Sequence, residues 1–384
     1  MISFVSKLRF PEERGVAAAD MAVCRSFVEI GQEIELLIPT RSLKIETNIW
    51  EYYQFKKNLF PVVKLFSLEL PFKHFYFFVM SWSFSIATFW YLFHNRRTHV
   101  HLFNECRELG ILLRIFSSIY RPWLIFEVHD LPANSYEAFL ERLMVGRVDL
   151  VLTTTNMFKR AYDKKNVLVY PNGVFLEDFD YKTPKPKIRK LLGLPIDKKI
   201  VGYAGRFLTT GMEKGIPELI KAVSRLKNVY LVCVGGPQSQ IKKYENIAGR
   251  LKFKNYLFLD RVPVKTLYLY MRAFDVCAMP FPWNEHFAYR MSPLKMFEYM
   301  ASKNPIVTTN LPVVKEVLKD KINAVMVKPS DPKSLAAGIN MLVNDITFGN
   351  KISHKAFEEV KKKYTWKRRA EEVIMASNFK YNKY

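Results

Sequence analysis

The chain has 384 residues, which is enough for two or three domains that each have a core of their own. Hydrophobic residues make up 49% of it, a fraction that excludes a disordered chain. The formal net charge of +23 favours anionic partners, namely phosphorylated small molecules, an anionic membrane surface or nucleic acid. The basic residues are scattered and form no recognisable nucleic-acid motif, which disfavours the last class.

The four cysteines lie far apart, have apolar neighbours and lack the spacing of a metal site. They are Cys24, Cys106, Cys233 and Cys277. We expect buried, reduced thiols, which are typical of the cytoplasm. The N-terminus does not follow the pattern of a signal peptide, because Lys7 and Arg9 precede any long apolar run. The sequence therefore predicts a cytoplasmic protein.

The first residues predict the beginning of a parallel sheet. Residues 2–5 are typical of a buried strand, residues 17–28 have apolar positions at helical spacing, and residues 34–38 form the next apolar run. A strand, a helix and a second strand in this order start an α/β domain. Gly15, at the start of the helix, would let a ligand approach the backbone closely, although an ordinary turn explains it equally well.

Residues 75–93 contain no charged side chain and are rich in aromatic residues. Their length is at the lower limit for a membrane span, and serines and a threonine dilute the apolar character. We expect a helix that packs on the first domain, and its apolar face has a bilayer surface as a second candidate contact. A true span is the weaker alternative. Residues 48–73 are aromatic and basic and receive no assignment.

A helix over residues 108–119 and a strand over residues 123–128 follow, and the strand ends at His129. Ligands of open α/β sheets bind beyond the carboxyl ends of the strands. His129 can there donate a hydrogen bond to a sugar hydroxyl or a carbonyl, or it can be a loop histidine with a structural role. Further strands are expected at residues 148–153 and 167–170.

Residues 182–190 contain two prolines and five basic residues, and we expect them to form a linker. Asp178 and Asp180 just before them have the spacing of a metal-binding pair, but we interpret them as part of the connection and expect no metal. Beyond the linker a strand over residues 200–204 runs into Arg206 and then, after a loop, into Lys214 and a helix.

A second helix start follows in the stretch that begins at Ser292. We expect Ser292 to cap this helix and Pro293 to lie in its first turn, where a missing N–H group costs nothing. Free N–H groups near Leu294, the ammonium of Lys295 and the carboxylate of Glu298 one turn further on would suit a diphosphate attached to a ribose or a sugar. The alternative is an ordinary amphipathic helix.

This stretch resembles the donor-site motif of the retaining glycosyltransferases of family four, in which two glutamates are separated by seven residues. Glu298 falls on the second glutamate, which holds the ribose hydroxyls in that family. Arg290 stands where the first would be, a departure that affects the contacts with the donor sugar. Arg206 and Lys214 fall on the two cations of the family that grip the donor phosphates. Physically, fixed cations stabilise a leaving diphosphate most in the transition state.

The resemblance implies the GT-B fold, in which two Rossmann-like doubly wound α/β domains face each other across a cleft. Residues 1–173 would form the acceptor domain, together with a returning C-terminal helix over residues 366–384. Residues 174–365 would form the nucleotide-sugar donor domain. His129 would lie near the donor sugar and act with Arg206 and Lys214 in catalysis. Val262 would contact the nucleotide base through its main chain, and the backbone amides of 292–295 would bind phosphate.

The resemblance also implies a retaining transfer from a nucleotide-diphosphate sugar, which is a substrate, and requires no cofactor. The acceptor would be a carbohydrate or a lipid-linked sugar in cell-surface polysaccharide or glycolipid synthesis, with the enzyme in the cytoplasm or peripherally on the inner face of the membrane. One alternative is a catalytically weakened binding subunit, because Arg290 replaces the glutamate. The other is a basic protein that binds nucleic acid or a membrane through its charge.

Overall fold

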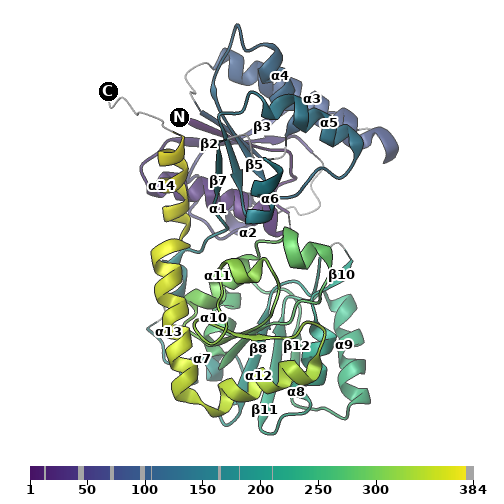
Figure 1. Ribbon diagram of the computed structural model, residues 1–384, viewed down its shortest axis with the longest axis vertical. Helices are drawn as coiled ribbons and strands as arrows, with labels where there is room; N and C mark the ends of the chain where they lie inside the picture. Colours follow the sequence, from purple (N-terminus) through teal and green to yellow (C-terminus); the bar gives the residue numbers. More distant parts are fainter. Residues whose placement is uncertain are drawn as a thin grey trace. The chain divides into compact units, whose positions relative to one another are not determined.

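The computed structural model describes residues 1–377 apart from 13, 42–46, 70–72, 96–99, 105, 163–165, 181 and 210. The chain divides into two compact units, one of Met1–Pro171 with Trp366–Tyr384 and one of Asn172–Thr365 (Figure 1). The division lies two residues before the boundary that we expected at residue 173. The last part of the expected returning helix, residues 378–384, lies outside the described residues.

The first unit is built on a sheet of seven parallel strands in the order β3-β2-β1-β4-β5-β6-β7. The strands are β1 (Ile2–Ser6), β2 (Ile34–Pro39), β3 (Val62–Leu65), β4 (Val100–Asn104), β5 (Trp123–Val128), β6 (Leu150–Thr153) and β7 (Val167–Val169). Because helices cover both faces, strands such as β1 and β2 are buried at every residue. The strand order reverses between β1 and β4, which places a topological switch point there.

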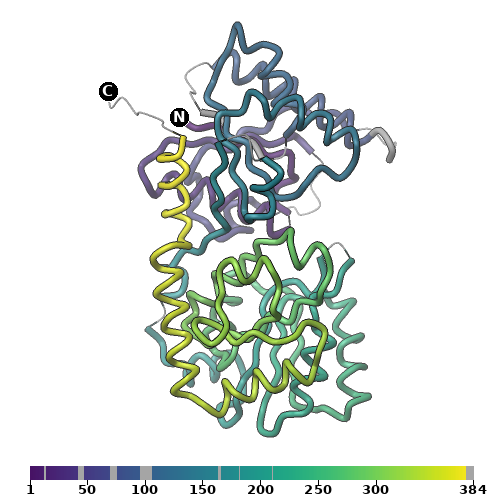
Figure 2. Tube along the Cα trace, viewed as in Figure 1, coloured from purple at the N-terminus to yellow at the C-terminus, as the bar shows by residue number. Residues whose placement is uncertain are grey.

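The helices of the first unit form two layers. They are α1 (Gly15–Glu29), α2 (Ile49–Tyr52), α3 (Lys73–His94), α4 (Arg107–Ile115), α5 (Ser135–Val145), α6 (Asn156–Ala161) and α14 (Trp366–Ala376). Val5 shares a core with α3, α4 and α5, so its neighbour Phe4 faces the opposite layer. There α1 packs against α14, and Figure 2 shows in purple and yellow how the two ends of the chain meet in this unit.

Two expectations for this unit need comment. The aromatic stretch forms a helix that packs on the sheet, as predicted. The helix expected over residues 108–119 ends at Ile115, so that prediction is wrong for its last turn. Ser117 and Ser118 come just after the C-cap residue Phe116, and serine side chains compete with the helical hydrogen bonds of the backbone.

The second unit contains six parallel strands in the order β12-β11-β8-β13-β14-β15. They are β8 (Lys199–Ala204), β11 (Val229–Val234), β12 (Tyr256–Leu259), β13 (Val276–Met279), β14 (Ile306–Thr309) and β15 (Val325–Val327), and β9 (Leu208–Thr209) with β10 (Met212–Glu213) forms a separate antiparallel pair. The order again reverses at the first strand, between β8 and β13, so both units are doubly wound. This confirms the predicted α/β fold class.

Helices cover both faces of this second sheet. They are α7 (Lys185–Leu191), α8 (Ile216–Val223), α9 (Gln238–Arg250), α10 (Val264–Ala273), α11 (Leu294–Ala301), α12 (Pro332–Asn344) and α13 (Ile346–Lys363), with the short turns η1 (Leu176–Phe179), η2 (His286–Arg290) and η3 (Val314–Glu316). One apolar cluster lies under α8, α9 and α12, and another lies under α7, α10, α11 and α13. The four cysteines are buried and free, as expected.

The expectation of a linker over residues 182–190 is wrong. Residues 185–191 form α7, because Pro184 and Pro186 occupy helix-start positions that suit proline. Arg189 is buried, and its guanidinium donates a 2.6 Å hydrogen bond to Asp275 and a 2.9 Å bond to the carbonyl of Ala273. The segment is therefore anchored in the second unit.

Candidate functional site

The carboxyl end of β8 carries the first cation of the expected site. Gly205 has a φ of +115°, which lets the chain turn sharply after the strand. A Cβ atom at Gly205 would lie 3.1 Å from Nζ of Lys295, so the glycine also makes room for that lysine. The carbonyl of Arg206 accepts a 2.8 Å hydrogen bond from the Tyr203 hydroxyl, which fixes the turn. Arg206 thus leaves the sheet at the switch point, where ligands of such folds bind.

The second cation, Lys214, ends the β9–β10 hairpin, and its N–H group donates a 3.0 Å hydrogen bond to the Phe207 carbonyl. Gly215 follows with a φ of +86° and caps α8. A Cβ atom at Gly215 would lie 1.8 Å from the Pro280 carbonyl oxygen, so the position requires glycine. Burial and the neighbouring charge of Arg206 lower the pKa of Lys214 to about 8. The two cations therefore repel each other across one loop.

A third cation, Lys295, lies in the same place. Its side chain is only 8% exposed, and no residue that the structure describes accepts a hydrogen bond from its Nζ. The ammonium lies 3.5 Å from the centroid of the Tyr203 ring, a cation–π distance. Burial, and then the charge of Lys214, hold the pKa of Lys295 well below its usual range. A buried ammonium without a hydrogen-bond acceptor is costly, and an anion placed between these cations would relieve that cost.

The start of α11 differs from the prediction. The helix begins at Leu294, and Pro293 occupies the N-cap position without a side-chain hydrogen bond. Ser292 does not cap the helix, because its hydroxyl accepts a 3.1 Å hydrogen bond from the Asn172 N–H group. The Asn172 side-chain amide also donates a 2.6 Å bond to the Ser292 carbonyl. Ser292 therefore positions the loop before the helix, and the helix start lies one residue later than expected.

Glu298 lies one turn beyond Lys295 on α11. Burial raises the pKa of Glu298 to about 7 although Lys295 opposes the shift, and Asp178 adds to it. The next residue, Tyr299, accepts a 2.7 Å hydrogen bond from the N–H group of Ala204 and so fixes α11 to the end of β8. Glu298 and the three cations thus gather at one edge of the second sheet, with the carboxylate near enough to Lys295 for each to shift the pKa of the other.

Arg290 and Val262 are the remaining residues of this unit that we expected to contact the donor. Arg290 lies at the end of η2, and its guanidinium pairs with the carboxylate of Glu285. A carboxylate is therefore present beside the position where the family has glutamate, but it comes from five residues earlier. Val262 is half-buried against the core after β12, and nothing in its side-chain packing indicates a ligand.

His129 lies in the first unit, directly after β5. Its Nε2 is 2.8 Å from Oε1 of Glu127, and the same oxygen accepts a 2.6 Å hydrogen bond from Nη2 of Arg369 on α14. Burial opposes ionisation of Glu127, but the charges of Arg369 and His129 outweigh it and lower the pKa of Glu127 to about 2. Gly15 is the exposed first residue of α1.

Sequence analysis missed Glu127 and Arg369. The signal that could have found them is the acidic residue inside the apolar run Trp123–Val128. A carboxylate in a buried strand requires a cation, and the C-terminal helix supplies it from 242 residues further along the chain.

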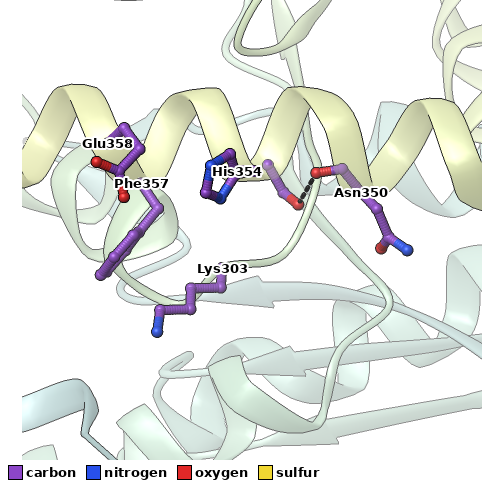
Figure 3. Close-up of a pocket in the computed structure, with 6 residues that line it drawn as sticks. Lys303, Asn350, His354, Phe357 and Glu358 are labelled. Carbon is purple, nitrogen blue, oxygen red and sulfur yellow. Dashed lines mark hydrogen bonds between the residues drawn. The ribbon is translucent and has the colours of Figure 1, made fainter.

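A separate hollow lies between the turn before β14 and one side of α13. Figure 3 shows its lining, which consists of Lys303, Asn350, Ser353, His354, Phe357 and Glu358. The ammonium of Lys303 lies 4.2 Å from the centroid of the Phe357 ring. None of the expected site residues lines this hollow, so it is distinct from the cation cluster. Among the described residues, no group of three or more histidines, cysteines, aspartates or glutamates could hold a metal ion.

Comparison with known families bears on the second unit. Residues 198–345, which include Arg206, Lys214, Arg290, Lys295 and Glu298, match the family model described as "Glycosyl transferases group 1". The residues similar to this family thus include the whole cation cluster.

Three curated relatives are each 27% or 28% identical to this chain over slightly more than half of its length. An uncharacterized glycosyltransferase of Methanocaldococcus jannaschii is 27% identical over 227 residues, which is 57% of this chain and 55% of that protein. A D-inositol 3-phosphate glycosyltransferase of Xylanimonas cellulosilytica is 28% identical over 56% of this chain and 54% of its own length. The capsular polysaccharide biosynthesis glycosyltransferase CapM of Staphylococcus aureus is 27% identical over 56% and 54%. The chain thus spans about half the length of the curated relatives it matches.

Solved structures resemble the whole chain. The sucrose-phosphate synthase of Thermosynechococcus elongatus superposes with a TM-score of 0.76 at 17% identity, covering 97% of each chain. HepE of Anabaena, solved in complex with UDP-glucose, gives a TM-score of 0.69 at 17% identity over 98% of this chain and 99% of that one. At these identities the likeness concerns the fold, which is the GT-B fold.

Proposed function

We propose that the chain is a retaining glycosyltransferase that moves a sugar from a nucleoside diphosphate sugar to a carbohydrate or lipid-linked acceptor, without a metal or cofactor. The observation that carries the proposal is the cluster of Arg206, Lys214 and Lys295 at the carboxyl end of β8, where Lys295 is buried and has no acceptor among the described residues. Such a cluster fits the diphosphate of a donor, and Glu298 one turn away fits the ribose hydroxyls.

The chemistry follows from the charges. As the bond between the sugar carbon and the diphosphate oxygen breaks, negative charge collects on the diphosphate, and the acceptor oxygen forms the new bond to the same carbon. Fixed cations stabilise that charge more in the transition state than in the bound donor. Each charged hydrogen bond contributes about 1.5–3 kcal/mol. Arg206 and Lys214 are therefore the proposed catalytic cations.

Further parts of the proposal rest on resemblance. His129 is proposed to contact the donor sugar, and its pairing with Glu127 supports this because it fixes the ring. The printed role of CapM in capsular polysaccharide biosynthesis supports an acceptor in cell-surface polysaccharide or glycolipid synthesis. We propose a cytoplasmic location for the enzyme.

The test is to incubate the full chain with a panel of nucleoside diphosphate sugars and to measure the free nucleoside diphosphate released. We expect slow release from one donor, faster release with an acceptor extract, and no loss of rate with EDTA. The anomeric configuration of the product, measured by NMR, should match that of the donor. Turnover that requires an added divalent cation, or a product of inverted configuration, would contradict the proposal.

One observation favours a second candidate, a GT-B subunit that binds the donor but turns it over poorly. Arg290 occupies the position of a donor-contacting glutamate in the family, and its guanidinium is engaged by Glu285. The same panel separates the two functions. A donor that binds and protects the protein from thermal unfolding, yet yields no nucleoside diphosphate with any acceptor extract, would favour the binding subunit.

A further inference from the structure

Helix α3 turns large apolar side chains outward. Phe77, Ile86 and Trp90 are 68%, 46% and 54% exposed. In contrast, Ser81, Ser85 and Thr88 of the same helix are buried. A helix that contacted only water on its outer side would show the reverse distribution, because burial favours the aromatic residues and exposure favours the hydroxyls. This inverted pattern indicates that the outer face of α3 has a partner other than water.

The buried side of α3 argues against a membrane span. By length and composition alone, Tyr76–His94 could cross a bilayer, and 39% of its most apolar window is buried in the protein. Phe84, Phe89 and Leu92 belong to a core shared with α4, α5 and the sheet. A span would expose that core, at the cost of the hydrophobic stabilisation of several large side chains. The helix is therefore placed to lie along a surface.

Neighbouring segments extend the apolar face. At the end of α4 and just beyond it, Ile115 and Ile119 are 63% and 62% exposed. Phe116 joins them to α3, since its ring centroid lies 4.9 Å from that of Phe89. On the other side, the indole N–H of Trp82 donates a 2.6 Å hydrogen bond to the Tyr136 hydroxyl on α5. We call this surface, formed by the outer sides of α3 and the end of α4, the aromatic face.

The charges that α3 and the end of α4 themselves contribute to the aromatic face have one sign. Arg121 and Arg147 are exposed, Arg114 is half-buried, and Arg147 donates a 3.2 Å hydrogen bond to Ser117 at the end of α4. The sequence contains no aspartate or glutamate in residues 70–104 or in residues 109–126. An apolar surface formed by segments that carry basic and no acidic residues complements a layer of anionic headgroups above hydrocarbon.

We propose that the aromatic face docks on the surface of a bilayer that contains anionic lipids. Trp90, Phe77 and Ile86 enter the boundary between headgroups and acyl chains, where amphipathic aromatic rings are stable. The arginines reach the lipid phosphates, and their aliphatic stems lie along the apolar surface. The inference goes beyond the proposed transferase activity and stands independently of it.

The same charges disfavour a second copy of the chain as the occupant. Two aromatic faces brought together would place arginines of one copy beside arginines of the other, and the acid-free segments offer no carboxylate to compensate. A bilayer with anionic headgroups has no such conflict.

The test is flotation of the full chain with lipid vesicles at low salt. We expect binding to vesicles of phosphatidylcholine mixed with phosphatidylglycerol, and weak binding to phosphatidylcholine alone. The triple variant Phe77→Ser, Ile86→Ser, Trp90→Ser should bind the mixed vesicles at least about tenfold more weakly, because it loses three interfacial side chains. The matched control is Leu191→Ser, Ile322→Ser, Ile346→Ser, at positions of the second unit that are 73%, 59% and 57% exposed. It should bind as the wild type does.

A second measurement locates the contact. Brominated acyl chains quench nearby tryptophans, so vesicle binding should lower the fluorescence of the wild type. The Trp90→Phe variant should bind equally well but lose most of that quenching. If the triple variant fails to keep the wild-type melting temperature, the single variant Trp90→Glu replaces it, since it places one repelling carboxylate at an exposed position.

Three results would overturn the inference. One is the absence of wild-type binding to the mixed vesicles. Another is equal binding by the triple variant and its control, which would assign docking to the general positive charge. The last is a dimer of the wild type, seen by sedimentation, that the triple variant abolishes.

Discussion

Each unit holds a glutamate with a shifted pKa, and the two pKa values shift in opposite directions. In the first, Glu127 at the end of β5 is held by Arg369 and His129, and its pKa falls to about 2. In the second, no residue that the structure describes donates a hydrogen bond to the carboxylate of Glu298 on α11. Burial raises the pKa of Glu298 to about 7. The paired carboxylate stabilises its unit. The other, with Lys295 beside it, leaves its unit short of partners, as a site prepared for a ligand would be.

The largest effect should come from removing the Arg369 guanidinium that pairs with Glu127. Arg369→Met leaves Glu127 buried beside His129 alone, so we expect the free energy of unfolding to fall by about 3–5 kcal/mol. Chemical denaturation measures it. Lys367→Met, at an exposed position of the same helix, is the control and should change little. An equal effect of both substitutions would show that the pair does not stabilise the unit.

The pairing of Glu127 with Arg369 also determines how the free energy of unfolding changes at acid pH. Because the pKa of Glu127 is lowered from 4.5 to about 2, its contribution is present above pH 4.5 and is lost as the pH falls towards 2. The wild type should therefore lose more stability over this range than Arg369→Met does.

The next effect concerns Lys214 in the cation cluster of the second unit. Lys214→Ala should lower turnover of the active donor at least about tenfold, because one charged hydrogen bond to the leaving diphosphate is lost. Its stability should hold or rise, since burial and Arg206 already disfavour the charged lysine. Lys221→Ala on the outside of α8 is the matched control, with a side chain that is 46% exposed. Turnover that matches this control would remove Lys214 from the site.

A smaller effect is expected from pH. Because the pKa of Lys214 is about 8 without ligand, a bound diphosphate selects the protonated ammonium. The affinity for a nucleoside diphosphate should weaken as the pH rises through 8, by at most about tenfold per pH unit. Calorimetry on Lys214→Arg should show a flatter dependence, because arginine stays charged. An unchanged slope in that variant would assign the dependence to another group.

The smallest effect is structural. Ser292→Ala removes the acceptor of the Asn172 N–H group and should lower the free energy of unfolding by about 1 kcal/mol. The loop before α11 would then be less well fixed, so the Michaelis constant for the donor should also rise. A variant with wild-type values of both would show that the carbonyl contact from the Asn172 side chain suffices.

The sequence predicted well what periodicity and local charge determine. Residues 2–5 and 34–38 appeared as neighbouring parallel strands, and the cations Arg206 and Lys214 lie together with the carboxylate of Glu298 one helix turn from Lys295. The strands depend on short-range patterns, which survive in a single sequence, whereas the gathering of Lys214 with Lys295, 81 residues later, was expected from the family resemblance.

The failures share a different cause. The basic segment around Arg189 was interpreted as a linker because its partner, Asp275, lies 86 residues away. Ser292 was expected to cap α11, but Asn172, 120 residues earlier, takes its hydroxyl. Glu127 and Arg369 were missed for the same reason. A polar side chain that is satisfied from a distant part of the chain looks, in the sequence alone, like a solvent-exposed one.

The buried cysteines have a practical consequence. Burial raises the pKa of all four thiols, so none offers the thiolate that maleimide dyes require. A cysteine introduced at an exposed lysine of either unit would then be the one reactive position on a wild-type background. Fluorophores can be attached to the molecule in this way without first removing any native residue.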